Sequence, residues 1–267
     1  MNISRAVHRH VIVLFIAVVI ALAQGCATTT GPVGSATKSN RATVESRAAD
    51  PFDDAQWATL LKGVALVEQK QPAQAITTSF EPVIAAYASR YSKTDKVFYS
   101  AQTMPETLMY LGDAASRNKD GSDTRNAVVL GPGWGYAWFW KGYALGELGD
   151  NAGAQVALQE ALRLSPYSSH FLSELGYTYL REKRWIETLS TYESADAFVV
   201  FAPDEDQKRE RGVAWRGQGY ALVELGRFDE AEAKYRACLK LDPQDEKARG
   251  ELAYVLEQKA KVKARKL

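Results

Sequence analysis

WRGQGYALVELGRFDEAEAKYRACLKLDP, residues 215–243, is the stretch that decides the fold, because other parts of the chain repeat its pattern. Its Gly219-Tyr220 pair is preceded by Gly142-Tyr143 and Gly176-Tyr177 and followed by Ala253-Tyr254. The spacings between these pairs are 34, 43 and 34 residues. A small residue that returns every 34 residues is typical of stacked helical hairpins, which present a surface for binding.

Length and composition set wide limits. The chain has 267 residues, enough for one large or two small domains. Apolar residues make up 46% and charged residues 24%, which is ordinary for a globular protein. The formal charge of +1 gives no sign of the basic face that nucleic acid usually requires, so we expect no nucleic-acid partner.

Three segments resemble the tetratricopeptide repeat family, whose pattern is W-x2-L-G-x2-Y, then A-x3-F, then a small residue and a proline. We place the three copies at 135–168, 169–202 and 212–245. The third copy carries Trp215, Gly219, Leu222, Gly226, Phe228, Ala231, Tyr235, Cys238 and Pro243. The copies depart from the pattern at Lys141, Thr188 and Gln218, respectively. The resemblance implies an all-α fold, an α-solenoid of helical hairpins.

Small residues in each copy indicate where the two helices of a hairpin touch. Gly142, Gly176 and Gly219 are expected at these contacts, since a side chain there would push the helices apart. Cys238 also occupies a small-residue position, so we interpret it as a buried small hydrophobe rather than a reactive thiol. Residues 246–267 are expected to form a capping helix with a basic tail, which covers the last apolar face with Leu252, Ala253 and Leu256.

The nine residues 203–211 between the second and third copies look like a helix start. Pro203 suits a first helical position, and Asp204, Glu205 and Asp206 suit a first turn. We therefore predict that the first helix of the third repeat is extended backwards by about two and a half turns.

Residues 50–134 are expected to form a divergent helical block of one or two degenerate hairpins, with an insertion around 90–130. Trp57, Leu60 and Val64 recur at helical spacing, and Pro82 should kink or end the second helix. Another helix is predicted from Met104 to about Arg117.

Residues 1–26 have the layout of a secretory signal, with Arg5 and Arg9 before an apolar run from Val11 to Ala23. The run is too short to span a bilayer as an ordinary helix. Residues 27–49 lack a hydrophobic period, so we interpret them as a flexible linker.

The end of the signal can be read in two ways. Leu22-Ala23-Gln24-Gly25-Cys26 resembles a bacterial lipobox, which implies lipid attachment at Cys26; Ala27 after it implies an outer-membrane lipoprotein facing the periplasm. Alternatively, cleavage after Ala23 at an A-x-A site would release a soluble periplasmic protein. We favour lipidation, and with it a membrane contact through the anchor at the bacterial cell envelope.

The resemblance also implies which residues face a partner. In this family the first helices of successive hairpins line a concave face, and repeat position nine lies on it. Here position nine is tyrosine throughout, and the expected contact residues are Tyr143, Tyr177, Tyr220, Tyr254, Phe139, His170, Arg181, Arg216 and Glu224. Such a groove suits an extended peptide or a partner helix, although each tyrosine could instead fill space between helices.

Signs of catalysis are weak. His170 is the only histidine outside the signal, and no H-E-x-x-H, C-x-x-C, G-x-S-x-G or Walker motif occurs. We therefore expect no catalytic residue, metal site, cofactor or small-molecule substrate, and predict a non-enzymatic scaffold or adaptor that binds a protein or peptide. An enzyme within residues 50–134 is the alternative, which buried carboxylates converging on a pocket would favour.

Overall fold

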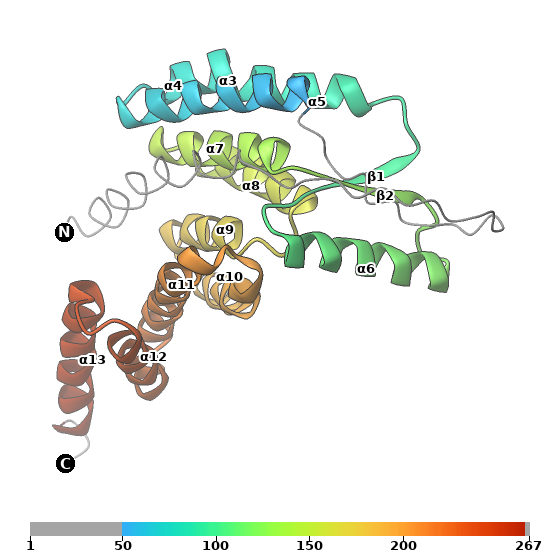
Figure 1. The fold of residues 1–267 in the computed structure, drawn as a ribbon. Helices are drawn as coiled ribbons and strands as arrows, with labels where there is room; N and C mark the ends of the chain where they lie inside the picture. The colour runs from blue at the N-terminus through green and yellow to red at the C-terminus, as the bar shows by residue number, and fades with distance from the viewer. Residues whose placement is uncertain (1–49, 265–267) are drawn as a thin grey trace. The chain divides into compact units, whose positions relative to one another are not determined.

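The computed structural model describes residues 50–264 and has an all-α fold with one small sheet (Figure 1). The expected signal and lipobox (1–26), the linker (27–49) and the last three residues of the basic tail lie outside the described residues.

Three helical hairpins and a final helix occupy the repeat region, as the 34-residue period predicts. The hairpins are α7 (Gly133–Glu147) with α8 (Asn151–Leu164), α9 (Ser169–Arg181) with α10 (Trp185–Phe198), and α11 (Asp204–Glu224) with α12 (Phe228–Leu241), followed by α13 (Glu246–Ala264). Each second helix also packs on the first helix of the next hairpin, and the first helices contact one another in sequence. The solenoid-type architecture is therefore confirmed.

The repeat glycines lie where the helices of a hairpin cross. A Cβ on Gly142 would stand 2.7 Å from Leu158, one on Gly176 3.0 Å from Tyr192, and one on Gly219 2.7 Å from Tyr235. A methyl group at Gly142 or Gly219 would force its neighbour to shift, and one at Gly176 would be tighter than most packed contacts, so glycine favours the observed approach. The buried Cys238, 1% exposed, completes the same core in the third hairpin, as predicted.

The predicted extension of the third repeat is confirmed, because α11 begins at Asp204 and runs unbroken to Glu224. Two of the residues that depart from the repeat pattern form polar contacts with other parts of the chain. Gln218 is fully buried and donates from Nε2 to the carbonyl of Tyr192 at 3.0 Å, and Lys141 pairs with Glu81 at 2.9 Å.

A further hairpin precedes the predicted repeats. It pairs α3 (Pro51–Glu68) with a helix made of α4 (Pro72–Ala75), a π-helical turn (Ile76–Phe80) and α5 (Glu81–Tyr91). Gly63 packs against Phe80 as the repeat glycines pack against their partners, since a Cβ on Gly63 would stand 2.4 Å from the ring. The partner lies 17 residues away instead of 16, and the extra residue that a π-turn accommodates accounts for the difference. The turn stands directly before Pro82, the residue expected to disturb this helix.

The insertion around 90–130 contains strands that the sequence analysis did not predict. β1 (Lys96–Ser100) and β2 (Asn126–Leu130) form a parallel pair in the register Lys96 to Asn126, and α6 (Met104–Asp120) connects them. Each strand is only five residues long. Such short apolar runs cannot be told from buried helix by periodicity, which explains why both were missed.

The capping helix α13 turns a different face inward from the one expected. Of the three residues expected on the inward side, Leu252 packs partly against the core, whereas Ala253 is exposed and Leu256 is 42% exposed. The structure buries Ala248 and Val255 most deeply instead. Lys259 pairs with Glu232 at 2.6 Å, which fastens this helix to α12.

Candidate functional site

The candidate site is the side of the first helices α7, α9, α11 and α13 that carries the four position-nine tyrosines, here called the inner face. Exposure increases along it toward the C-terminus. Tyr143 is 6% exposed, Tyr177 and Tyr220 are half-buried, and Tyr254 is 48% exposed. The packing role that the sequence left open therefore applies best to Tyr143, and the contact role to Tyr220 and Tyr254.

The N-terminal half of the inner face is packed against other parts of the chain. Phe139 is 2% exposed, and its ring lies 4.5 Å from the ring of His170. Tyr136 beside them is also buried and contacts Trp57 edge to face at 6.0 Å. Phe139 and His170 thus serve the core in this conformation, and their contact with a partner stays a prediction.

Two predicted cationic contact residues are engaged within the protein. Arg181 is exposed, but its Nη1 donates to the carbonyl of Gly146 at 2.7 Å, which joins α9 to α7. Arg216 forms an ion pair with Asp245 just before α13. Both arginines therefore brace neighbouring first helices.

The C-terminal half of the inner face carries Tyr220, Glu224, Glu251 and Tyr254, here called the cap-end cluster. Glu224 and Tyr254 are exposed, and Tyr220 packs against Trp185 with ring centroids 6.1 Å apart. Burial and the nearby Glu224, Glu251 and Tyr254 raise the pKa of Tyr220, which places the four side chains in one electrostatic neighbourhood. Of these residues, the sequence analysis did not select Glu251, because it lies outside the family's concave positions.

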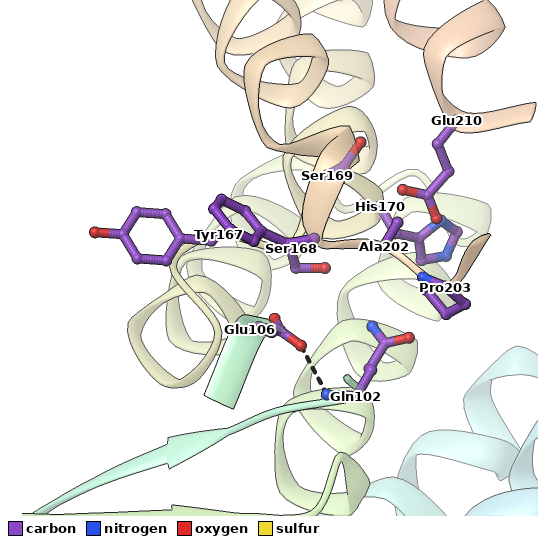
Figure 2. Close-up of a pocket in the computed structure, with 10 residues that line it drawn as sticks. Gln102, Glu106, Tyr167, Ser168, Ser169, His170, Ala202, Pro203 and Glu210 are labelled. Atoms are coloured by element: carbon purple, nitrogen blue, oxygen red, sulfur yellow. Dashed lines mark hydrogen bonds between the residues drawn. The ribbon is translucent and has the colours of Figure 1, made fainter. Parts of the chain in front are cut away.

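A small polar cavity lies between the α6 insertion and the repeats (Figure 2). Its volume is about 10 Å³, on the scale at which one water molecule needs about 10–15 Å³. Its lining residues include Gln102, Glu106, Ser169, His170 and Glu210. The cavity therefore has room for one water molecule and none for a metabolite.

Glu106, on one side of this cavity, has a structural role. Thr103 is the N-cap of α6 and accepts from the backbone of Glu106, and the Glu106 carboxylate accepts from the backbone of Gln102 at 2.7 Å. Its second oxygen accepts from the hydroxyl of Tyr110. This arrangement is a capping box extended by one residue, and the T-x-x-E spacing at 103–106 is the signal that could have revealed it.

Glu210, on the other side, is 5% exposed, and its Oε2 has no hydrogen-bond partner. The neighbouring Ser169 Oγ is likewise buried without a partner. Burial raises the pKa of Glu210 to about 7, although Arg209 opposes this effect, and burial lowers the pKa of His170 to about 3. Near neutral pH His170 is therefore uncharged and Glu210 is about half ionised, and both face a Glu106 whose hydrogen bonds are already made.

Two further properties bear on the choice of function. Within residues 50–264, no three or more His, Cys, Asp or Glu side chains are grouped so that they could hold a metal ion. In the same range, no helix combines the length and the apolar character that a membrane span needs.

Comparison with known proteins agrees with the geometry. The tetratricopeptide repeat model matches residues 135–168 and 212–245, which are the first and third hairpins. These matches and the hairpin architecture define an all-α fold of the tetratricopeptide type. A search of curated proteins found no match.

Several solved structures are similar to this chain. MamA from Desulfovibrio magneticus RS-1, residues 41 to the end, aligns with a TM-score of 0.51 and 15% identity over 81% of this chain and 90% of that one. The first tetratricopeptide domain of Spaghetti (RPAP3), bound to the HSP90 peptide SRMEEVD, has a TM-score of 0.42 and 21% identity over 47% and 93%. The Arabidopsis OM64 domain gives 0.42 and 20% over 46% and 95%. At these identities the likeness concerns the fold alone.

Proposed function

We propose that this protein is a non-enzymatic scaffold or adaptor that binds a peptide or protein on its inner face. The observation that carries the proposal is the row of tyrosines on contacting first helices, of which Tyr254 is 48% exposed and Tyr220 is half-buried. Tyrosine offers a large apolar area, few rotors and a polar tip, which suits contact with a polypeptide. Repeat proteins commonly bind partners along such helix rows.

A binding assay tests this role. Randomised 12-residue peptides displayed on phage are selected against the wild-type protein, and the enriched peptides are measured by fluorescence anisotropy. The double variant Tyr220→Ala and Tyr254→Ala should weaken binding by about 2 kcal/mol for each residue that is a hot spot. Leu256→Ala is the control, since Leu256 is 42% exposed on α13 and lies two residues from Tyr254. Absence of any selected peptide, or equal loss in the control, would refute the proposed function.

The cavity between α6 and α11 bears on the enzymatic alternative. It brings Glu106 and Glu210 toward one space, which is the kind of convergence that would favour catalysis. However, both oxygens of Glu106 accept hydrogen bonds from the protein, and the space holds one water molecule. We therefore do not propose catalysis at this cavity.

The proposed location is the bacterial cell envelope, with Cys26 acylated and the protein held at the outer membrane facing the periplasm. It rests on the signal-like residues 1–26 and the lipobox-like Leu22 to Cys26. Mass spectrometry of the mature N-terminus tests it. An acylated Cys26 supports the proposal, whereas a free Gln24 would mean cleavage after Ala23 and a soluble periplasmic protein.

A further inference from the structure

α13 occupies the place of a first helix in the stack, and it is the last helix among residues 50–264 (Figure 1). It packs on α12 through the buried residues Ala248 and Val255. Ala214, which lies 34 residues before Ala248, is buried on α11 against Tyr192 of the preceding hairpin in the same way. The side of α13 that a first helix turns toward the preceding hairpin is therefore filled.

The side of α13 on which a second helix would cross is open to solvent. Ala253 lies 34 residues after Gly219, at the crossing position of the repeat. In the three hairpins the second helix covers this position, as Leu158 covers Gly142 and Tyr235 covers Gly219. Ala253 is exposed instead. A position that is small in order to let a helix approach thus lacks that helix in the described part of the chain.

Leu256 gives the same side of α13 the character of a second helix as well. Each second helix has a large residue at the crossing with smaller residues four positions before it and three after it, as in Ala154-Leu158-Ala161, Thr188-Tyr192-Ala195 and Ala231-Tyr235-Cys238. On α13, Leu256 has Ala253 three positions before it and Ala260 four after it, which is the same spacing in the opposite direction. Residues at these spacings share one side of a helix. Ala253, Leu256 and Ala260, here called the open face, are all exposed, Leu256 by 42%.

We propose that the open face of α13 binds the open face of a second copy of this protein, with the two α13 helices antiparallel. A surface that carries both halves of a contact is complementary to itself about a two-fold axis. Leu256 of each copy would lie over the partner's Ala253, as Leu158 lies over Gly142 within one chain. The contact between copies would thus continue the contact between first and second helices that the stack already makes three times.

Charges near the two ends of α13 fit the antiparallel arrangement. When Leu256 lies opposite the partner's Ala253, Glu246 at the start of the helix lies opposite Lys263 of the partner subunit. Both side chains are exposed, and Glu246 also pairs with Arg249 on its own helix. The two-fold axis forms this pair of opposite charges twice, whereas a parallel arrangement would bring like charges together.

A dimer of this kind would carry two inner faces. A partner with two binding segments could then be held by both copies, which raises its overall affinity without any new contact. Dimerisation needs no other partner, so the proposal stands or falls independently of the proposed function.

Sedimentation velocity of the mature protein, in detergent matched in density to the solvent, measures the dimer. One helix from each copy is a small contact beside the ~1,200–2,000 Å² of stable complexes, so we expect a dissociation constant on the order of 10 µM. Ala253→Gln should weaken the dimer about tenfold or more, because its longer side chain stands between the helices. Ala115→Gln is the control, since Ala115 is exposed on α6. Leu256→Ala should weaken the dimer and leave peptide binding to the inner face unchanged.

Reversal of the charges tests the orientation. Glu246→Lys and Lys263→Glu should each weaken the dimer about fivefold, and the double variant should return to within about twofold of the wild type. An effect within one helix would not be rescued in this way, because the two residues lie at opposite ends of α13. A protein that stays monomeric up to about 200 µM, a dimer that Ala253→Gln leaves unchanged, or a double variant without rescue would overturn the proposal.

Discussion

Replacing Glu210 by glutamine is expected to stabilise the protein above neutral pH and to change little near pH 4. The side chain is 5% exposed and its Oε2 has no partner, so ionisation leaves a charge in the interior that Arg209, 3.6 Å from Oε1, compensates only in part. Burial raises its pKa from 4.5 to about 7. Each pKa unit corresponds to about 1.36 kcal/mol, so the full linkage is about 3 kcal/mol.

The direction of the pH dependence follows from which state of the protein binds the Glu210 proton more tightly. The folded state holds the proton on Glu210 more tightly than the unfolded chain, so its contribution to stability is fully present below about pH 4.5 and is lost as pH rises through about 7. Glutamine cannot ionise, so the variant does not lose this stability as the pH rises. The difference in free energy of unfolding should therefore grow between pH 4.5 and 7 and level off above about pH 8.

Urea unfolding at half-unit pH steps from 4 to 9, followed by circular dichroism, measures this difference. Titration of His170, whose pKa falls to about 3, destabilises both proteins at low pH and largely cancels in the comparison. Glu205→Gln, on the exposed part of the same helix, should give a flat difference. A flat difference for Glu210→Gln as well would show that Glu210 titrates normally and would refute the account of the cavity.

Four other substitutions test the packing, each by thermal and urea unfolding. Gly219→Ala should destabilise by about 1–3 kcal/mol because its methyl would clash with Tyr235, whereas Gly250→Ala, with nothing within 4 Å, should stabilise by about 1 kcal/mol through helix propensity. Stabilisation by both would contradict the close crossing. Tyr235→Phe should raise the free energy of unfolding by about 1 kcal/mol, since it removes a buried hydroxyl without a partner; a loss of similar size would reveal a hidden hydrogen bond. Lys183→Gly should stabilise by about 1 kcal/mol, because Lys183 has a φ of 59° where the first and third repeat hairpins have Gly149 and Gly226; a decrease would mean that its side chain contributes to packing.

The glycine at each hairpin crossing shows what could be predicted and where prediction ended. The 34-residue repeat pattern predicts that the helices cross at Gly142, Gly176 and Gly219. In each repeat the glycine and its partner on the second helix are separated by the same number of residues. Gly63 plays the same part, but its partner Phe80 is displaced by one residue through a π-turn, so no period reveals it. The strands β1 and β2 were missed for a related reason, since five residues are too few to establish a period.

The candidate site, too, could be predicted from the sequence only in part. The positions of the four tyrosines follow from the repeat, and Tyr254 was found although the cap departs from the pattern. Their exposure does not follow from it, because Tyr143 is covered while Tyr254 is open. Burial depends on which distant segments pack nearby, and spacing along the chain carries no information about that.

By itself, the sequence determined the hairpins, their glycine crossings and the backward extension of α11, because each depends on residues within one repeat or one helix turn. Only the tertiary structure decided that Glu210 would be enclosed opposite Glu106. These residues come from segments far apart in the chain. Their surroundings, and hence their charge and chemistry, are set by contacts that exist only after the helices have packed.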